Sequence, residues 1–327
     1  MSQNSPRIYV EAPDTLPGDG RFYVGGWIAA TEPIASAAGG GDGRQPLVRR
    51  DRPDVRAAFP DLPFVAGFGG EVHRGAIQQG KLVLEFEVGG RNVTFRQVLF
   101  AVALPPDRLQ VRQVGGVWGG NFFSAGSAML EQIDSAFQDA GFALGSAARI
   151  LDFGCGCGRV LLNFSNWPHI GEIWGCDIDA EAIAWNRGNL AAIAKFDCNR
   201  ELPPLAFPDG FFDAIYSVSV FTHLPEDMQF AWLAELRRVL RPGGVLVATV
   251  HGRRYWTVDP GVKAEVEQRG FAYRTGEKTE GLPEFYMVAF HGEGYLRERW
   301  AKFFEVVAVK VDHIYGVHDA VVLRRPA

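Results

Sequence analysis

Cysteine is scarce in this sequence, and its distribution is uneven. All four cysteines follow residue 150, at Cys155, Cys157, Cys176 and Cys198. A disulfide framework that staples the whole chain would also need cysteines in its first part, so this distribution excludes one. Cys155 and Cys157 are spaced C-x-C rather than the C-x2-C usual at zinc sites, and both belong to a glycine-rich turn that has another explanation. We therefore expect no metal site.

The chain also lacks long apolar runs and an excess of positive charge. Its 33 Lys and Arg residues stand against 38 Asp and Glu residues, and the net charge of −5 gives a nucleic-acid partner no electrostatic support. The N-terminal residues MSQNSPRIYVEAP have neither the basic start nor the apolar core of a signal peptide. No apolar stretch is long enough to cross a bilayer. These observations predict a cytoplasmic protein without a membrane span or a nucleic-acid partner.

The first part of the chain has the pattern of β-strands joined by turns. Apolar and charged residues alternate over 84–88, Gly89 and Gly90 follow, and a second short run covers 93–95, which predicts a tight hairpin. No long helical period appears before residue 106, where Pro105 and Pro106 interrupt any regular element. The sequence predicts a small β-sandwich-like domain over residues 1–106. A linker and lead-in would follow over 107–125, including the glycine pairs at 115–116 and 119–120.

From residue 126 onward, helical and strand patterns alternate. Apolar strands are expected at 149–153, 172–176, 212–217 and 245–250, with helices at 128–142, 180–190 and 225–240. Alternation with apolar strands predicts a parallel sheet covered by helices on both faces. We expect this second domain to run over 126–327.

A glycine-rich turn follows the first of these strands, in the run LDFGCGCGR. Its alternating glycines allow a tight turn and a close approach to a ligand. The rival motif is the dinucleotide turn G-x-G-x-x-G, but the spacing here is G-x-G-x-G, and Arg159 stands where the third glycine should fall. Asp152, two residues before the first glycine, would repel a pyrophosphate but suit a ligand that carries an ammonium group. This turn therefore disfavours NAD.

A second acidic residue, Asp177, lies 19 residues after Gly158 at the end of the next expected strand. In this architecture a carboxylate at that place reaches a ribose diol. The alternative is that Asp177 only caps a loop or helix. Together with Asp152 it fits an adenosyl ligand with a cationic far end, as in S-adenosylmethionine (SAM), which carries an ammonium and a sulfonium.

The run from ILDFGCGCGRVL through IWGCDID to FPDGFFDAIYSVSVFTHLPEDMQFAWLAELRRVLRPGGVLVATVHG resembles the class I SAM-dependent methyltransferases, and the resemblance covers about residues 120–325. It implies an α/β fold class: a Rossmann-like seven-stranded methyltransferase sheet, its last strand antiparallel, behind a smaller N-terminal all-β domain. It also implies SAM as cofactor and S-adenosylhomocysteine as product. By position, it implies that Asp152, Gly154, Cys155, Gly156 and Gly158 line the methionine end, that Asp177 binds the ribose, that Ile178, Cys198 and Asn199 meet the adenine, and that Ser217 to Ser219 pass beside the methyl group.

Two histidines are candidates for a general base. Methyl transfer from a sulfonium releases a neutral leaving group, so a base is needed only when the nucleophile must lose a proton. His223 follows the fourth strand and His251 ends the fifth, which places both at the carboxyl edge where ligands bind. His291 is a weaker candidate. The alternative for His223 is a structural hydrogen bond to the backbone.

The segment 252–294 is expected to form a substrate-cap insertion. It is rich in arginine and aromatic residues, which suit a sugar or an anionic glycan, although the aromatics could equally form the insertion's own core. The N-terminal runs GGWIAA and RRDRPDVRAAFPDLPFVAGF resemble β-sandwich modules of bacterial glycosyltransferases and methyltransferases in surface-polysaccharide assembly. Asp51, Arg52 and Asp54 within them could also be a structural ion-pair corner.

Two functions follow from these patterns. The first is a SAM-dependent methyltransferase (EC 2.1.1.-) that acts on a small-molecule or glycan acceptor, such as a sugar hydroxyl in bacterial glycan assembly. The alternative is a SAM-binding scaffold without turnover, whose β-domain recognises a glycan or a partner. An NAD-dependent enzyme is disfavoured by Arg159 and Asp152.

Overall fold

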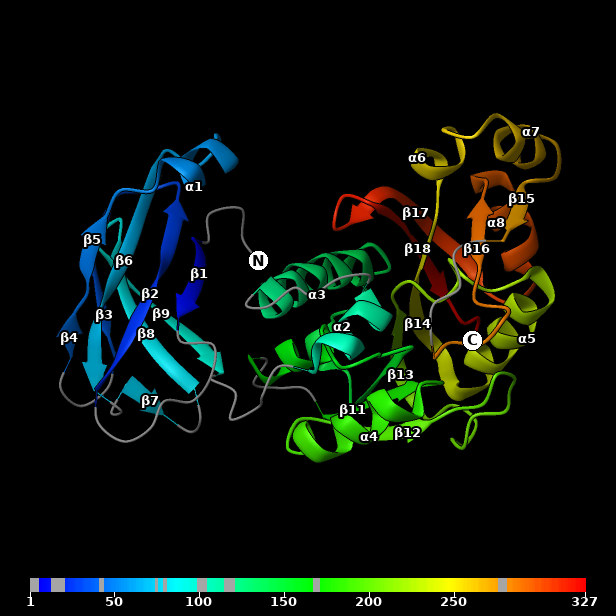
Figure 1. Ribbon diagram of the computed structural model, residues 1–327, viewed down its shortest axis with the longest axis horizontal. Helices are drawn as coiled ribbons and strands as arrows, with labels where there is room; N and C mark the ends of the chain where they lie inside the picture. The colour runs from blue at the N-terminus through cyan, green and yellow to red at the C-terminus, as the bar shows by residue number, and fades with distance from the viewer. Residues whose placement is uncertain are drawn as a thin grey trace. The chain divides into compact units, whose positions relative to one another are not determined.

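The chain consists of two compact units, Met1–Leu104 and Pro105–Ala327 (Figure 1). The predicted linker glycines at 115–116 and 119–120 lie outside the described residues. The computed structural model describes residues 6–12, 21–40, 44–73, 76–78, 81–98, 105–114, 121–166, 171–275 and 281–327.

The first unit is built from antiparallel strands, in agreement with the expected all-β class. Its core forms because alternate residues of β8, Leu82, Leu84, Phe86 and Val88, are buried, and Phe86 packs edge-on against Phe68 at 5.1 Å between ring centroids. One sheet has the order β1 (Arg7–Ala12), β2 (Arg21–Ala30), β6 (Phe64–His73), β5 (Val48–Arg50), and the other has the order β4 (Gln45–Pro46), β3 (Ile34–Gly39), β8 (Lys81–Val88), β7 (Ile77–Gln78), with β9 (Arg91–Val98) paired to β8.

The predicted glycine hairpin joins β8 to β9. Val88 pairs with Arg91, and Gly89 and Gly90 between them have φ values of +58° and +72°, which glycine adopts without strain.

The acidic and basic residues near α1 (Pro53–Ala58) form ion pairs with one another. Arg52 donates to Asp54 at 2.9 and 2.7 Å, and Arg56 donates to Asp51 at 3.0 Å. The structural interpretation of this corner therefore accounts for Asp51, Arg52 and Asp54.

The second unit contains a seven-stranded sheet in which five parallel strands are followed by an antiparallel pair. This arrangement confirms the predicted fold class. The order reverses at β10 (Arg149–Phe153) and β13 (Phe212–Ser217), which run parallel side by side. Ligands bind beyond the carboxyl ends of strands at such a switch point. The order is β12 (Lys195–Cys198), β11 (Glu172–Asp177), β10 (Arg149–Phe153), β13 (Phe212–Ser217), β14 (Leu240–Val250), β18 (His318–Arg324), β17 (Glu305–Ile314).

Helices pack on both faces of this sheet. Leu246, Ala248 and Val250 of β14 join a core with α5 (Glu226–Val239) and α8 (Glu293–Arg299), while Val245 and Val247 between them are also buried. α3 (Asn121–Asp139) packs against β14, β17 and β18, and α4 (Ala180–Asn189) packs against β11 and β12. α2 (Asp107–Val114) precedes them. Among the described residues, no helix combines the length and apolar character needed to cross a membrane.

Two glycines in helices have opposite surroundings. A Cβ atom at Gly126 in α3 would lie 1.9 Å from the carbonyl oxygen of Arg159, so this helix meets the segment after the glycine turn backbone to backbone. A Cβ atom at Gly188 in α4 would have no neighbour within 4 Å. Glycine is therefore required by packing at the first position only.

We expect Gly126→Ala to lower the free energy of unfolding by about 1–3 kcal/mol, because α3 must move away from Arg159. Gly188→Ala should raise it by roughly 0.5–1 kcal/mol, because alanine loses less backbone entropy in a helix. Urea denaturation of both variants and the wild type measures these changes. Equal effects of the two substitutions would contradict the close packing of α3.

Candidate functional site

The glycine turn connects β10 to the segment that ends in a short 3-10 helix, Leu161–Asn166. Gly154, Gly156 and Gly158 have φ values of +79°, +51° and +80°, in the left-handed region that favours glycine. A Cβ at Gly154 would also lie 2.1 Å from Val220. The amide of Gly154 donates to the carbonyl of Cys176 at 2.8 Å, which ties the turn to β11.

Asp152 lies behind this turn at the end of β10, with only 3% of its surface exposed. Tyr216 on β13 donates its hydroxyl to the Asp152 carboxylate at 2.8 Å. Burial raises the pKa of Asp152 to about 8, while the Tyr216 hydrogen bond opposes this rise. At neutral pH the ligand-free protein therefore holds this carboxyl mainly in its protonated form.

Asp177 joins the end of β11 to the turn. Its carboxylate accepts hydrogen bonds from the amides of Gly156 at 2.7 Å and Asp179 at 2.8 Å. Burial raises the pKa of Asp177 to about 6, and these backbone donors oppose the rise. Asp179, rather than Asp177, caps α4, by accepting from the amides of Glu181 and Ala182.

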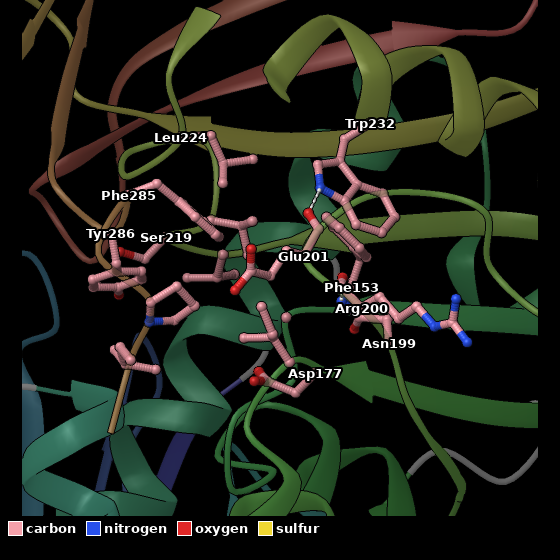
Figure 2. A pocket seen from close by; sticks show the side chains of 16 residues that line it. Phe153, Asp177, Asn199, Arg200, Glu201, Ser219, Leu224, Trp232, Phe285 and Tyr286 are labelled. Carbon is pink, nitrogen blue, oxygen red and sulfur yellow. Dashed lines mark hydrogen bonds between the residues drawn. The ribbon is translucent and has the colours of Figure 1, made fainter. Parts of the chain in front are cut away.

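A cavity opens beyond the carboxyl ends of β10, β11 and β13 (Figure 2). Its empty space, including space open to solvent, amounts to about 710 Å³. The lining residues are Phe153, Gly154, Asp177, Ile178, Asn199, Arg200, Glu201, Val218, Ser219, Val220, Leu224, Trp232, Leu282, Pro283, Phe285 and Tyr286.

Four of the ten cofactor residues expected from the sequence line this cavity: Gly154, Asp177, Ile178 and Asn199. The other six do not contribute to its lining. Asp152 and Gly156 are linked to the site through the hydrogen bonds above, and Ser217 is fully buried. The remaining three are Cys155, Gly158 and Cys198, of which Cys198 is exposed.

One lining residue had no functional signal in the sequence pattern, and two others lie in the expected substrate-cap insertion. Trp232 lies on the expected helix, yet only the fold brings its indole to the cavity, where Nε1 donates to the carbonyl of Glu201 at 3.2 Å (Figure 2). Phe285 and Tyr286 belong to the expected insertion, and Figure 2 shows both beside Ser219. Their sequence distance from the glycine turn, more than a hundred positions, hides this proximity.

His223 lies immediately outside the cavity lining. Its Nδ1 donates to the carbonyl of Met287 at 2.6 Å, and its ring stacks on Tyr286 at 3.9 Å between centroids. Burial lowers the pKa of His223, so the ring is neutral at pH 7 and Nε2 keeps its lone pair. This Nε2 lies 3.4 Å from Ser219 Oγ. His223 therefore makes the structural hydrogen bond to the backbone through Nδ1, and its Nε2 lone pair faces Ser219.

His251 lies further along the same edge, beside His318. The His251 ring centroid is 6.1 Å from that of His223 and 5.2 Å from that of His318. Burial lowers the pKa of His251 to about 3 and that of His318 to about 4. The Nδ1 atoms of both rings are buried and bond to no other described residue. Both imidazoles are thus uncharged at neutral pH.

His291 has a structural role. The amide nitrogen of Gln229 donates to the carbonyls of Phe221 and Leu224, which leaves Oε1 as the acceptor for His291 Nε2 at 3.0 Å. Burial lowers the pKa of His291 to about 3. This ring bridges α5 and the insertion rather than facing the cavity.

Most aromatic residues of the insertion pack in hydrophobic cores. Phe271 belongs to the main core, and Trp256 and Phe290 pack against buried residues of α7 (Pro260–Arg269). Phe285 and Tyr286 instead line the cavity. Residues 276–280 lie outside the described residues. The insertion contains α6 (Arg253–Trp256), α7 (Pro260–Arg269), β15 (Phe271–Arg274) and β16 (Val288–His291).

In the part of the chain that the structure describes, no three His, Cys, Asp or Glu side chains are arranged to hold a metal ion.

Residues 150–244 match the profile of a family described as a methyltransferase domain. The probable methyltransferase ltbC of Aspergillus luteorubrus is 32% identical over 137 residues, which cover 38% of this chain and 48% of that protein. The 2-methyl-6-phytyl-1,4-hydroquinone methyltransferase of Synechocystis sp. is 34% identical over 110 residues, or 32% of each chain. The chain thus spans less than half the length of these curated relatives.

A solved structure, 1,6-didemethyltoxoflavin-N1-methyltransferase of Burkholderia thailandensis, is 17% identical with a TM-score of 0.46, covering 70% of this chain and 95% of that one. The family match over residues 150–244 contains the glycine turn, Asp177 and β13. This family match confirms the resemblance drawn from the sequence motifs.

The buried Asp152 carboxyl makes a prediction about stability. Its folded pKa of about 8 exceeds the ordinary value of 3.8, so the folded state binds a proton that the unfolded state releases between these values. The contribution of Asp152 to the free energy of unfolding is therefore largest below about pH 4. It falls by roughly 1.4 kcal/mol per pH unit as the pH rises from about 4 to 8. We expect Asp152→Asn, which keeps an acceptor for Tyr216, to lose this part of the slope.

Chemical denaturation of the ligand-free wild type and Asp152→Asn at several pH values measures the difference. Asp177 is unchanged in both proteins and serves as an internal control for the decline between pH 4 and 6. Parallel pH dependences for the two proteins would show that Asp152 ionises normally.

Proposed function

We propose that this chain, which carries a class I SAM-dependent methyltransferase domain, transfers the methyl group of SAM to a hydroxyl group of a small acceptor. The observation that carries the proposal is the cavity at the strand ends, where the glycine turn, Asp177 and Asn199 border one space. When bound, SAM supplies an electrophilic methyl group on a sulfonium sulfur.

The residues at the cavity fit the chemistry of this cofactor. Asp177 is already held by two backbone donors, and its carboxylate has further lone pairs for a ribose diol. Ile178 and Asn199 provide an apolar and a polar contact for a purine. Asp152 is buried next to the turn, and a cation there would lower the pKa of Asp152 and favour its charged form.

His223 is the group that accepts the acceptor's proton in this proposal. Its neutral ring and its Nδ1 bond to Met287 keep the Nε2 lone pair available. His251 is the second candidate, because it lies on the same edge and is also neutral. The enclosing aromatic groups exclude water, and the strands hold the reacting groups in place.

A sugar hydroxyl is the proposed acceptor, with the N-terminal β-unit as a glycan-binding module. The resemblance of that unit to modules of polysaccharide assembly supports this assignment, as do the aromatic surfaces of Phe285 and Tyr286 at the cavity. The relatives' names include a hydroquinone and, in Gallus gallus METTL2, a tRNA cytidine, so the acceptor panel should also include hydroxylated rings.

Calorimetric titration tests the cofactor assignment. We expect SAM to bind and NAD to give no heat. Asp177→Ala should weaken SAM binding by 10-fold or more, since hydrogen bonds to a charged group contribute about 1.5–3 kcal/mol.

Asp177→Asn is the matched variant for this titration, because it retains one acceptor oxygen and should lose less affinity. The melting temperatures of both variants show whether the turn is intact. Binding of NAD, or SAM binding unchanged in Asp177→Ala, would refute the cofactor assignment. SAM binding without transfer to any acceptor would instead support the scaffold.

The pH dependence of methyl transfer tests His223. Burial lowers the pKa of His223 from its ordinary value of 6.5. At pH 6.5 Nε2 is therefore still mainly unprotonated, and kcat should fall only at a lower pH. His223→Gln should abolish this acid limb and lower kcat by roughly 10²–10⁴-fold. His291→Gln is the control, since the His291 ring is buried and faces Gln229. An acid limb retained in His223→Gln would assign it to another group.

A further inference from the structure

Ser219 has a backbone conformation that serine rarely adopts. Its φ of +60° lies in the left-handed region, where a side chain is strained and glycine is not. The residue lies between the end of β13 and His223, and it lines the cavity. Strained residues of this kind gather at functional sites, where their surroundings impose the conformation. The retention of a serine here raises the question of what its hydroxyl does.

Buried groups on both sides impose this conformation. The amide of Ser219 donates to Thr249 Oγ1 on β14 at 2.7 Å, and Ser219 Oγ lies 3.1 Å from Thr222 Oγ1. Both threonines are fully buried. Thr222 is itself tied to the insertion, because its carbonyl accepts from the amide of Ala289 at 2.8 Å. The hydroxyl of Ser219 is therefore held in one position.

The hydrogen atoms around Ser219 can be assigned in order. His223 Nδ1 bears the ring proton because it donates to Met287, so Nε2 must accept and Ser219 must donate in the 3.4 Å contact. This distance is long, as catalytic hydrogen bonds often are before substrate binds. The single hydroxyl hydrogen of Ser219 is then used, so Thr222 donates to Ser219 Oγ. One lone pair of Oγ remains for a donor in the cavity.

Ser219 thus stands between the cavity and the base. Ser219 lines the cavity, as Figure 2 shows, whereas His223 does not. Tyr286 lies against the His223 ring at 3.9 Å and occupies the neighbouring part of the lining. An acceptor in the cavity therefore meets the Ser219 hydroxyl before it can meet His223 Nε2.

We propose that Ser219 is a catalytic residue that relays the proton of an acceptor hydroxyl to His223. This inference rests on the proposed methyltransferase function. The acceptor oxygen forms its bond to the methyl carbon as the carbon–sulfur bond breaks. Its O–H proton passes to Ser219 Oγ, while the Ser219 proton passes to His223 Nε2, so serine is unchanged and histidine becomes the imidazolium. The carbonyl of Met287 on Nδ1 stabilises that cation.

The proposal also defines the substrate class. A relay is useful only for a nucleophile that must lose a proton at neutral pH, such as an alcohol or a phenol. A thiol that is already ionised gains nothing from it. The acceptor is therefore a hydroxyl compound, of sugar or aromatic origin.

Ser219→Gly gives the decisive test, because the substitution removes the hydroxyl and relieves the strain together. Its melting temperature should rise by about 2–4 °C. Transfer of labelled methyl from SAM to catechol or to methyl α-D-glucopyranoside should fall in kcat by roughly 10²–10⁴-fold, with SAM affinity unchanged. Ser219→Ala should lose the same activity without the gain in stability. Asp312→Gly relieves a similar strain, at φ +48°, outside the cavity lining, and should keep full activity.

Thiophenol, tested at a pH where it is ionised, is the acceptor control, and any transfer to it should be equal in wild type and Ser219→Gly. Preference for catechol or for the glucoside identifies the source of the hydroxyl. The relay is refuted if Ser219→Gly keeps its activity towards the hydroxyl probes, if it loses stability as well as activity, or if the wild type methylates neither hydroxyl probe. Failure of SAM to bind in calorimetry would refute the proposed function itself, whereas binding with any of these three outcomes refutes the relay alone.

Discussion

Two carboxyl groups are buried side by side at the ends of neighbouring parallel strands, and the surrounding structure compensates for them. Asp152 is the next-to-last residue of β10 and Asp177 is the last residue of β11, and each is less than a tenth exposed. Burial of such groups is unfavourable unless donors surround them. Tyr216 supplies a donor to Asp152, and the amides of Gly156 and Asp179 supply donors to Asp177. Gly156, which donates its amide to Asp177, has a φ of +51°, in the left-handed region that favours glycine.

The strand order separates two kinds of chemistry along one edge of the sheet. Acidic and amide groups lie at the ends of β10, β11 and β12, where an adenosyl ligand is proposed to bind. Neutral imidazoles lie beyond β13, β14 and at the start of β18. Burial keeps His223, His251 and His318 uncharged, so this half of the edge suits an uncharged acceptor better than a polyanion. Ser219 lies between the halves.

The insertion contributes aromatic side chains, rather than charged ones, to the lining of the cavity. Phe271 belongs to the main core and Trp256 packs against buried residues of α7, whereas Phe285 and Tyr286 line the cavity. Met287 connects the insertion to His223 in two ways: its carbonyl accepts from His223 Nδ1, and its amide donates to the carbonyl of His223. A shift of the insertion would therefore alter the tautomer and the orientation of the imidazole.

The sequence by itself determined the order of strands and helices, the glycine turn, the acidic residues that flank it and the all-β character of the first unit. These features are local: hydrophobic periodicity and backbone freedom act over a few residues and can be recognised without knowing the fold. Only the tertiary structure decided which side chains share a cavity. Trp232, Phe285 and Tyr286 reach it from separate elements, Ser217 turns into the core while Ser219 faces the cavity, and His291 is engaged by Gln229. Such outcomes depend on long-range packing and on the direction of individual hydrogen bonds, which a linear pattern does not encode.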